Sequence, residues 1–144
     1  MKRKGKYVPG GFVLQVKRSR TGLGLFAGEP IPTGACIIEY KGRTISEEEA
    51  YTSRSKYLFE VTSKKTIDGR PTWNRAGYIN HSCKPNSDPV TRNARVYIMA
   101  TKNIKEGEEL SYDYGDEYFN DYIKPVGCKC QKCTIPSLNQ YKKY

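Results

Sequence analysis

The chain of 144 residues is 37% hydrophobic and 28% charged and holds 12 tyrosines, which suits one folded domain and excludes wholesale disorder. No apolar run approaches the roughly 18 residues of a membrane span, and no secretory apolar segment follows the basic start, so we expect an intracellular protein without membrane insertion. The formal net charge is +10, with seven basic and no acidic side chains in residues 1–28 and seven acidic and no basic ones in residues 106–121. The basic end suits a polyanion such as nucleic acid and the acidic stretch suits a basic partner. The alternative is that both runs are solvated surface that only aids solubility, an explanation that fits the N-terminal run equally well.

The first third of the chain alternates short strands with turns. Residues 1–11 are basic and carry Pro9-Gly10-Gly11, which predicts a loose arm. Strands are expected at residues 12–16 and 36–40. Between them we expect a flexible loop at residues 22–24 and a turn marked by Pro and Gly at residues 30–34. Ser46 opens the Ser-x-x-Glu pattern of a capping box, so a short helix is expected to begin there.

The remainder of the sequence predicts further strands rather than long helices. Aromatic and β-branched residues favour strands at residues 57–62 and 95–101, with a shorter one at 65–68 and another at 109–114 after a turn at residues 106–107. A strand–helix–strand pattern is absent, and the Gly-Leu-Gly at residues 22–24 lacks the third glycine and the following helix of a dinucleotide-binding loop. The fold class is therefore expected to be mainly β.

Five cysteines are present, and three of them stand within six residues as Cys128, Cys130 and Cys133. The odd total argues against a disulfide framework, whereas clustered thiols suit zinc, which prefers four tetrahedral ligands. The cluster supplies three ligands. The residues themselves leave Cys36, Cys83 and His81 open as candidates for the fourth.

Three segments carry the most specific signal in the chain. They are Gly-Leu-Gly-Leu-Phe-Ala at residues 22–27, Tyr-Ile-Asn-His-Ser-Cys-Lys-Pro-Asn at 78–86 and Gly-Glu-Glu-Leu-Ser-Tyr-Asp-Tyr-Gly at 107–115. Shorter matches lie between them at residues 39–42, 57–60 and 67–68. In this order, and followed by the cysteine tail, they closely resemble the SET-domain protein lysine methyltransferases. The resemblance covers roughly residues 12–133.

The resemblance implies a fold and a domain organisation. The SET-domain fold consists of small curved β-sheets with a threaded C-terminal segment and one or two short helices. The family pattern places a SET domain at residues 12–120 and a post-SET zinc-binding tail at residues 121–144, after the basic arm of residues 1–11. The chain is thus expected to be a short, single-domain member of the family.

The resemblance also implies an active site. The positions that match the family's S-adenosylmethionine site are Gly22, Leu23, Gly24, Tyr57, Asn80 and His81. The positions that match the catalytic tyrosine and the lysine channel are Tyr114, Tyr112 and Tyr40. Gly77 stands where the family often has an arginine near the cofactor, and Arg75 is a possible substitute.

In many family members the cysteine of the Asn-His-Ser-Cys segment joins three tail cysteines around one zinc ion. This implies a site made of Cys83, Cys128, Cys130 and Cys133, with Cys36 as a buried apolar residue. The tail here has two residues in its second gap, fewer than the commonest form of the family.

The expected function is transfer of a methyl group from S-adenosylmethionine to a lysine of a histone tail or another basic protein. Because residue 112 is a tyrosine, the resemblance favours monomethylation. The basic arm is expected to contact nucleic acid, and a eukaryotic source would place the protein in the nucleus, on chromatin. The alternative is a non-catalytic module of the same fold that binds lysine-bearing peptides or nucleic acid.

Overall fold

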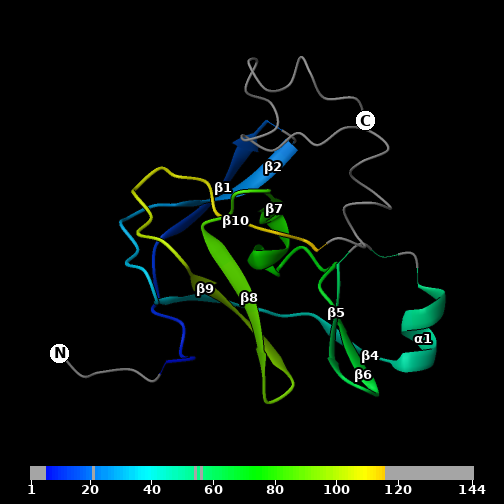
Figure 1. The fold of residues 1–144 in the computed structure, drawn as a ribbon. Coiled ribbons are helices and arrows are strands. Elements are labelled where there is room, and N and C mark those ends of the chain that lie inside the picture. The colour runs from blue at the N-terminus through cyan, green and yellow to red at the C-terminus, as the bar shows by residue number, and fades with distance from the viewer. Residues whose placement is uncertain (1–5, 21, 54, 56, 116–144) are drawn as a thin grey trace.

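The computed structural model describes residues 6–20, 22–53, 55 and 57–115. Its elements are β1 (Leu14–Ser19), β2 (Gly22–Ala27), β3 (Cys36–Tyr40), β4 (Arg43–Ser46), α1 (Glu47–Thr52), β5 (Leu58–Thr62), β6 (Lys65–Asp68), the 3₁₀ helix η1 (Arg75–Tyr78), β7 (Asn80–His81), β8 (Ser87–Arg92), β9 (Arg95–Ala100) and β10 (Ser111–Tyr112). The strands form four small sheets, in the orders β1-β2, β10-β7, β3-β9-β8 and β4-β6-β5. The prediction of a mainly β fold with one or two short helices is confirmed (Figure 1).

The sheet β3-β9-β8 is the centre of the molecule because both of its faces are covered. Val96 and Ile98 of β9 are fully buried on the face that joins the main hydrophobic core. Tyr97 and Met99, which alternate with them, pack with Cys36 in a second cluster on the other face. A strand that is buried on both faces has a nearly continuous run of apolar residues, as residues 96–100 do. The strand expected at residues 95–101 is confirmed as β9.

The second cluster also holds the described part of the N-terminal arm. The ring centroid of Tyr7 lies 5.6 Å from that of Tyr97, and the backbone N–H of Gly10 donates to the carbonyl of Cys36 at 3.0 Å. The loose arm expected at residues 1–11 is therefore held at two points, by the partial burial of Tyr7 and by the hydrogen bond of Gly10. Residues 1–5 of the arm lie outside the described residues.

The predicted loop at residues 22–24 is also wrong, because these residues begin β2. The strand pairs with β1 in antiparallel register from Ser19–Gly22 to Leu14–Ala27. Leu25 and Ala27 are fully buried, so packing of the far end of the hairpin holds the glycine-rich end in the strand conformation. Figure 1 shows this hairpin on the opposite side of the molecule from α1.

The helix that the capping box predicts adjoins the sheet β4-β6-β5, because α1 begins directly after β4. Ser46 is the N-cap of α1, and its hydroxyl accepts a hydrogen bond from the backbone N–H of Glu49 at 3.1 Å. In the described part of the chain no helix has the length and apolar character needed to cross a membrane. The predicted strand at residues 109–114 is shorter than expected, because Ser111 and Tyr112 alone form β10, paired with β7, and Glu109 makes an isolated bridge to Phe26.

Candidate active site

The site is organised around the place where β10 meets β7. The two strands pair in parallel, Ser111 with Asn80 and Tyr112 with His81, so two motifs that are thirty residues apart in sequence lie side by side. Buried Asn86 fastens the junction from beneath. Its amide donates to the carbonyl of Glu109 at 2.9 Å, and its Oδ1 accepts from the backbone N–H of Ser111 at 3.0 Å. Asn86 thus supports the crossing as a structural residue.

His81 acts within this crossing as a backbone acceptor. Its Nδ1 accepts a hydrogen bond from the N–H of Tyr114 at 3.1 Å, and its Nε2 lies 3.4 Å from the sulfur of Cys83. Because a backbone N–H can only donate, Nδ1 is unprotonated and the ring is neutral. Burial lowers the pKa of His81, and the nearby carboxylate of Asp113 opposes this shift only in part. The neutral ring therefore places Tyr114 rather than serving as a proton acceptor.

A chain of aromatic rings runs from the main core to Tyr114. The ring centroids of Tyr40 and Phe59 are 4.6 Å apart, those of Phe59 and Tyr112 6.1 Å, and those of Tyr112 and Tyr114 4.9 Å. The Tyr114 hydroxyl donates to the carbonyl of Ile79, immediately before β7. The structure thus brings the three expected catalytic tyrosines into one wall and adds Phe59, which the sequence analysis did not single out although it lies in the motif at residues 57–60.

Tyr40 and Tyr57 differ in exposure but are joined by a hydrogen bond. Tyr40 is 1% exposed, and its hydroxyl donates to the backbone carbonyl of Tyr57 at 3.0 Å. Its ring fills the space where any side chain at Gly69 would stand. Tyr57 is 42% exposed. The buried tyrosine therefore fixes the backbone from which the exposed one projects.

Of the expected cofactor residues, Leu23 and Gly24 lie against the side chain of Asn80. Its amide nitrogen lies 3.1 Å from the carbonyl oxygen of Leu23 and 2.8 Å from Oε2 of Glu109. A Cβ added at Gly24 would overlap the Glu109 carboxylate, so the absent side chain allows this close approach. Glu109 is a residue of the site that the sequence analysis missed. The Nη1 of Arg75 is directed elsewhere, to the carbonyl of Leu14 at 3.4 Å.

The expected zinc ligands divide between described and undescribed parts of the chain. Cys83 is partly exposed, next to His81. Cys128, Cys130 and Cys133, like the whole predicted tail of residues 121–144, lie outside the described residues. Among the residues that the structure does describe, no three potential metal ligands lie together. Cys36 is buried, and burial raises the pKa of its thiol to about 11, as expected of an apolar packing residue.

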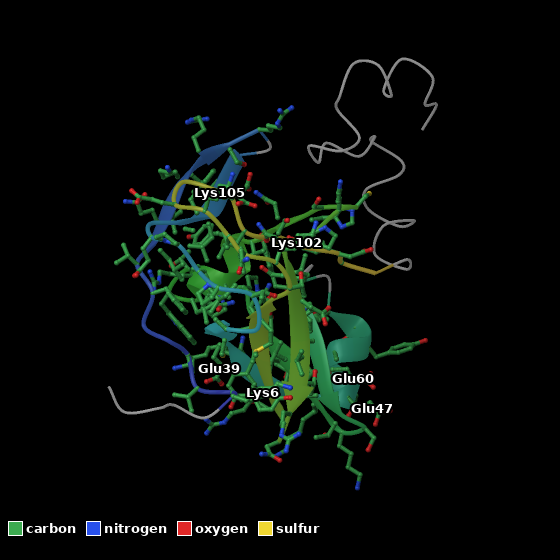
Figure 2. All side chains as sticks on the ribbon, turned by 60° about the vertical axis from the view of Figure 1, so that its left-hand side comes forward. Lys6, Glu39, Glu47, Glu60, Lys102 and Lys105 are labelled. Atoms are coloured by element: carbon green, nitrogen blue, oxygen red, sulfur yellow. The ribbon has the colours of Figure 1, made fainter. Side chains whose placement is uncertain are left out.

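Charge is distributed unevenly around the site. Glu47, Glu48 and Glu49 form the first turn of α1. Figure 2 shows Glu47 and Glu60 beside α1 in the lower part of the view, where Lys6 also lies, and Lys105 in the upper part. The first turn of α1 is therefore a locally acidic surface, which favours a basic ligand there.

Comparison with known proteins identifies the family. The SET domain family model matches residues 22–115, and the chain belongs to this family. It is 34% identical to histone-lysine N-methyltransferase ASHH3 of Arabidopsis thaliana over 139 residues, which is 85% of this chain and 38% of that protein. It is also 34% identical to human histone-lysine N-methyltransferase EHMT1 over 140 residues, 86% of this chain and 11% of that protein. The chain thus spans well under half of these relatives.

Solved structures agree with this assignment. The polycomb repressive complex 2 of Chaetomium thermophilum superposes with a TM-score of 0.65 at 32% identity, over 73% of this chain and 15% of that one. KRYPTONITE, solved in complex with mCHH DNA, an H3(1–15) peptide and SAH, superposes with a TM-score of 0.62 at 34% identity, over 73% and 24%. The SET-domain fold expected from the ordered motifs is confirmed.

Proposed function

We propose that this protein is a protein-lysine N-methyltransferase that uses S-adenosylmethionine. The observation that carries the proposal is the junction of β7 and β10, where the Asn80 side chain meets the glycine-rich strand and the Tyr112 and Tyr114 rings stand together within a few ångströms. The relatives are named histone-lysine N-methyltransferases, and one related structure was solved bound to S-adenosylmethionine.

The chemistry explains why an aromatic wall belongs at this place. A lysine amine must be neutral to attack a methyl group, yet its ordinary pKa is about 10.4, so neutrality at pH 7 costs roughly 4–5 kcal/mol. Burial among the rings of Phe59, Tyr112 and Tyr114 disfavours the ammonium, and the sulfonium of the bound cofactor adds like-charge repulsion. The rings also hold the amine in line with the transferred methyl group, and such alignment supplies much of the rate. The proton leaves to water, since His81 already accepts a backbone hydrogen bond.

The proposed roles follow the two sides of the junction. Gly22, Leu23, Gly24, Asn80 and His81 bind the cofactor, with Tyr57 at the inner end of the lysine channel. Tyr114 is the catalytic tyrosine and Tyr112 lines the channel. Tyr40 supports the channel from within the core, in keeping with its hydrogen bond to the Tyr57 carbonyl.

The proposed degree of methylation depends on Tyr112. A hydroxyl at this position occupies space and holds water beside the amine, which favours transfer of a single methyl group. Replacing Tyr112 with Phe removes that hydroxyl, so the highest methyl state found by mass spectrometry is expected to rise. An unchanged highest state would contradict the proposed role.

The proposed zinc site joins Cys83 to Cys128, Cys130 and Cys133. Four thiolates suit tetrahedral zinc, and the Cys83 side chain is partly exposed. The ion would hold the post-SET tail, residues 121–144, across the active site. Metal analysis of the full chain is expected to find one zinc per chain, lost or weakened in Cys83→Ser and retained in Cys36→Ser.

The proposed substrate is a lysine in a basic segment such as a histone tail. The acidic surface of α1 supports it, as do the names of the relatives and the H3 peptide in the KRYPTONITE complex. Such a substrate places the protein on chromatin. The basic residues of the arm at 1–11 would then contact the nucleic acid of the nucleosome, an effect that added salt would weaken.

The direct test incubates the full chain with labelled S-adenosylmethionine and either recombinant nucleosomes or an H3 peptide, with Tyr114→Phe as control. The expected result is label in a lysine of the substrate for the wild type, reduced at least about a hundredfold in the variant. Cofactor and peptide binding without transfer by a folded wild-type protein would contradict the enzyme and favour the non-catalytic binding module.

A further inference from the structure

The side-chain amide of Asn80 has a determined orientation. Its nitrogen lies within hydrogen-bond distance of Glu109 Oε2 at 2.8 Å, the Leu23 carbonyl oxygen at 3.1 Å and the Ser19 hydroxyl at 3.2 Å. An ionised carboxylate and a backbone carbonyl can only accept hydrogen bonds. Turning the amide over would set Oδ1 against both of these acceptors, so the nitrogen must face them.

Glu109 is the strongest of the three partners. Its hydrogen bond is the shortest and is the only one of them to an ionised group. The backbone around Glu109 is itself fastened to β2, through a bridge to Phe26 and a hydrogen bond from the N–H of Leu110 to the Leu25 carbonyl at 2.8 Å. The carboxylate therefore stands at a fixed place beside Gly24, where no side chain obstructs it.

The other end of the amide is left for a ligand. In the part of the chain that the structure describes, no hydrogen-bond donor lies within bonding distance of Asn80 Oδ1, whereas the nitrogen has three acceptors. We infer that Glu109 is a positioning residue: it holds the Asn80 amide with Oδ1 presented to a hydrogen-bond donor of the bound cofactor. This inference rests on the proposed function, because it takes S-adenosylmethionine as the ligand.

A double-mutant cycle tests the inference, with the dissociation constant of S-adenosylmethionine measured by calorimetry on the full chain. Glu109→Ala is expected to weaken binding about tenfold, which is the usual size of a lost hydrogen bond to a charged group. Glu109→Gln keeps an acceptor and is expected to stay within about threefold of the wild type. Glu106→Ala removes a nearby exposed charge and serves as the matched control, with binding unchanged.

The cycle is completed with Asn80→Ala and the double variant. Because Glu109 acts through Asn80, the double variant is expected to bind as Asn80→Ala does, within about twofold. Additive losses, or equal losses in Glu109→Gln and Glu109→Ala, would overturn the inference. If circular dichroism shows that Glu109→Ala is unfolded, Glu109→Met, of similar volume, replaces it in the cycle.

The outcomes separate this inference from the proposed function. A folded wild type that does not bind the cofactor contradicts the proposed function. A wild type that binds, with binding lost in Asn80→Ala but unchanged in Glu109→Ala, leaves the proposed function standing and overturns only the role of Glu109.

Discussion

The two sides of the β7–β10 junction are built by different physical means. On the β1–β2 side, directional polar contacts around Asn80 join three separate segments, and a glycine at position 24 leaves room for them. On the other side, Tyr40, Phe59, Tyr112 and Tyr114 are held by ring packing. The polar side suits recognition of a charged ligand, and the aromatic side suits a reaction that needs a dry amine. If this division is correct, substitutions on the two sides should affect different steps.

The largest effect is expected on the aromatic side. Tyr114→Phe removes the hydroxyl that bonds to the Ile79 carbonyl, the directional contact that fixes the rotation of the ring. Turnover is expected to fall at least about a hundredfold, because alignment of the amine is lost, while the dissociation constant of S-adenosylmethionine changes less than about threefold. Single-turnover kinetics and calorimetry measure the two quantities, and a matching loss in both would erase the distinction between the two sides.

Asn86 lies beneath both sides, so its removal should damage them together. Asn86→Ala would remove the two hydrogen bonds by which the buried Asn86 side chain holds Glu109 and Ser111, at an expected cost of about 3 kcal/mol in the free energy of unfolding. Urea denaturation measures this loss. Asn103→Ala is the matched control, because its amide oxygen accepts only an exposed bond from the Thr33 N–H, and it is expected to cost about 1 kcal/mol or less. Equal losses of unfolding free energy in Asn86→Ala and Asn103→Ala would contradict a special role of the crossing.

A smaller effect is expected from Gly24→Ala on the polar side. The new methyl group would overlap the Glu109 carboxylate and displace it from Asn80. Cofactor affinity is expected to fall about tenfold, the size of a modest overpacking effect, while turnover at saturating cofactor stays near that of the wild type. A normal affinity with slow turnover would reverse the assignment of the two sides.

The smallest effect concerns the central sheet, which supports both sides equally. Burial raises the pKa of the Cys36 thiol from 9.0 to about 11, so as pH rises past 9 the unfolded chain loses this proton before the folded one does. The folded state is therefore destabilised at high pH. Relative to Cys36→Ala, the wild type is expected to lose about 1 kcal/mol of stability between pH 8 and pH 10. If the stability difference between the wild type and Cys36→Ala were the same at pH 8 and pH 10, the burial effect would be contradicted.

The sequence predicted the elements whose signals are local. The capping box at Ser46 and the apolar strand β3 came out as expected, because a side chain and its own neighbours determine them. β8 was missed because it contains Pro89 and polar residues, which argue against a strand. Its place at the edge of the β3-β9-β8 sheet tolerates both. The loop expected at residues 22–24 became a strand because pairing with β1 overrides the conformational freedom of glycine.

The part of the candidate site that lies within sequence motifs could be predicted. The ordered segments containing Asn80, Tyr112 and Tyr114 pointed to one place, and the structure brings them together. Glu109 was beyond prediction, because its role depends on a contact with Asn80 across 29 positions of sequence. Nothing in the local pattern of residues 107–110 distinguishes it from Glu108, whose carboxylate accepts from the Lys105 N–H instead.

One comparison tests the separation of binding from chemistry most directly. Cofactor affinity and single-turnover methyl transfer would be measured on the same preparations of wild type, Gly24→Ala and Tyr114→Phe. The account predicts a crossed result: Gly24→Ala binds the cofactor weakly but transfers well at saturation, and Tyr114→Phe binds normally but transfers slowly. Two variants that lose binding and transfer in equal proportion would contradict it.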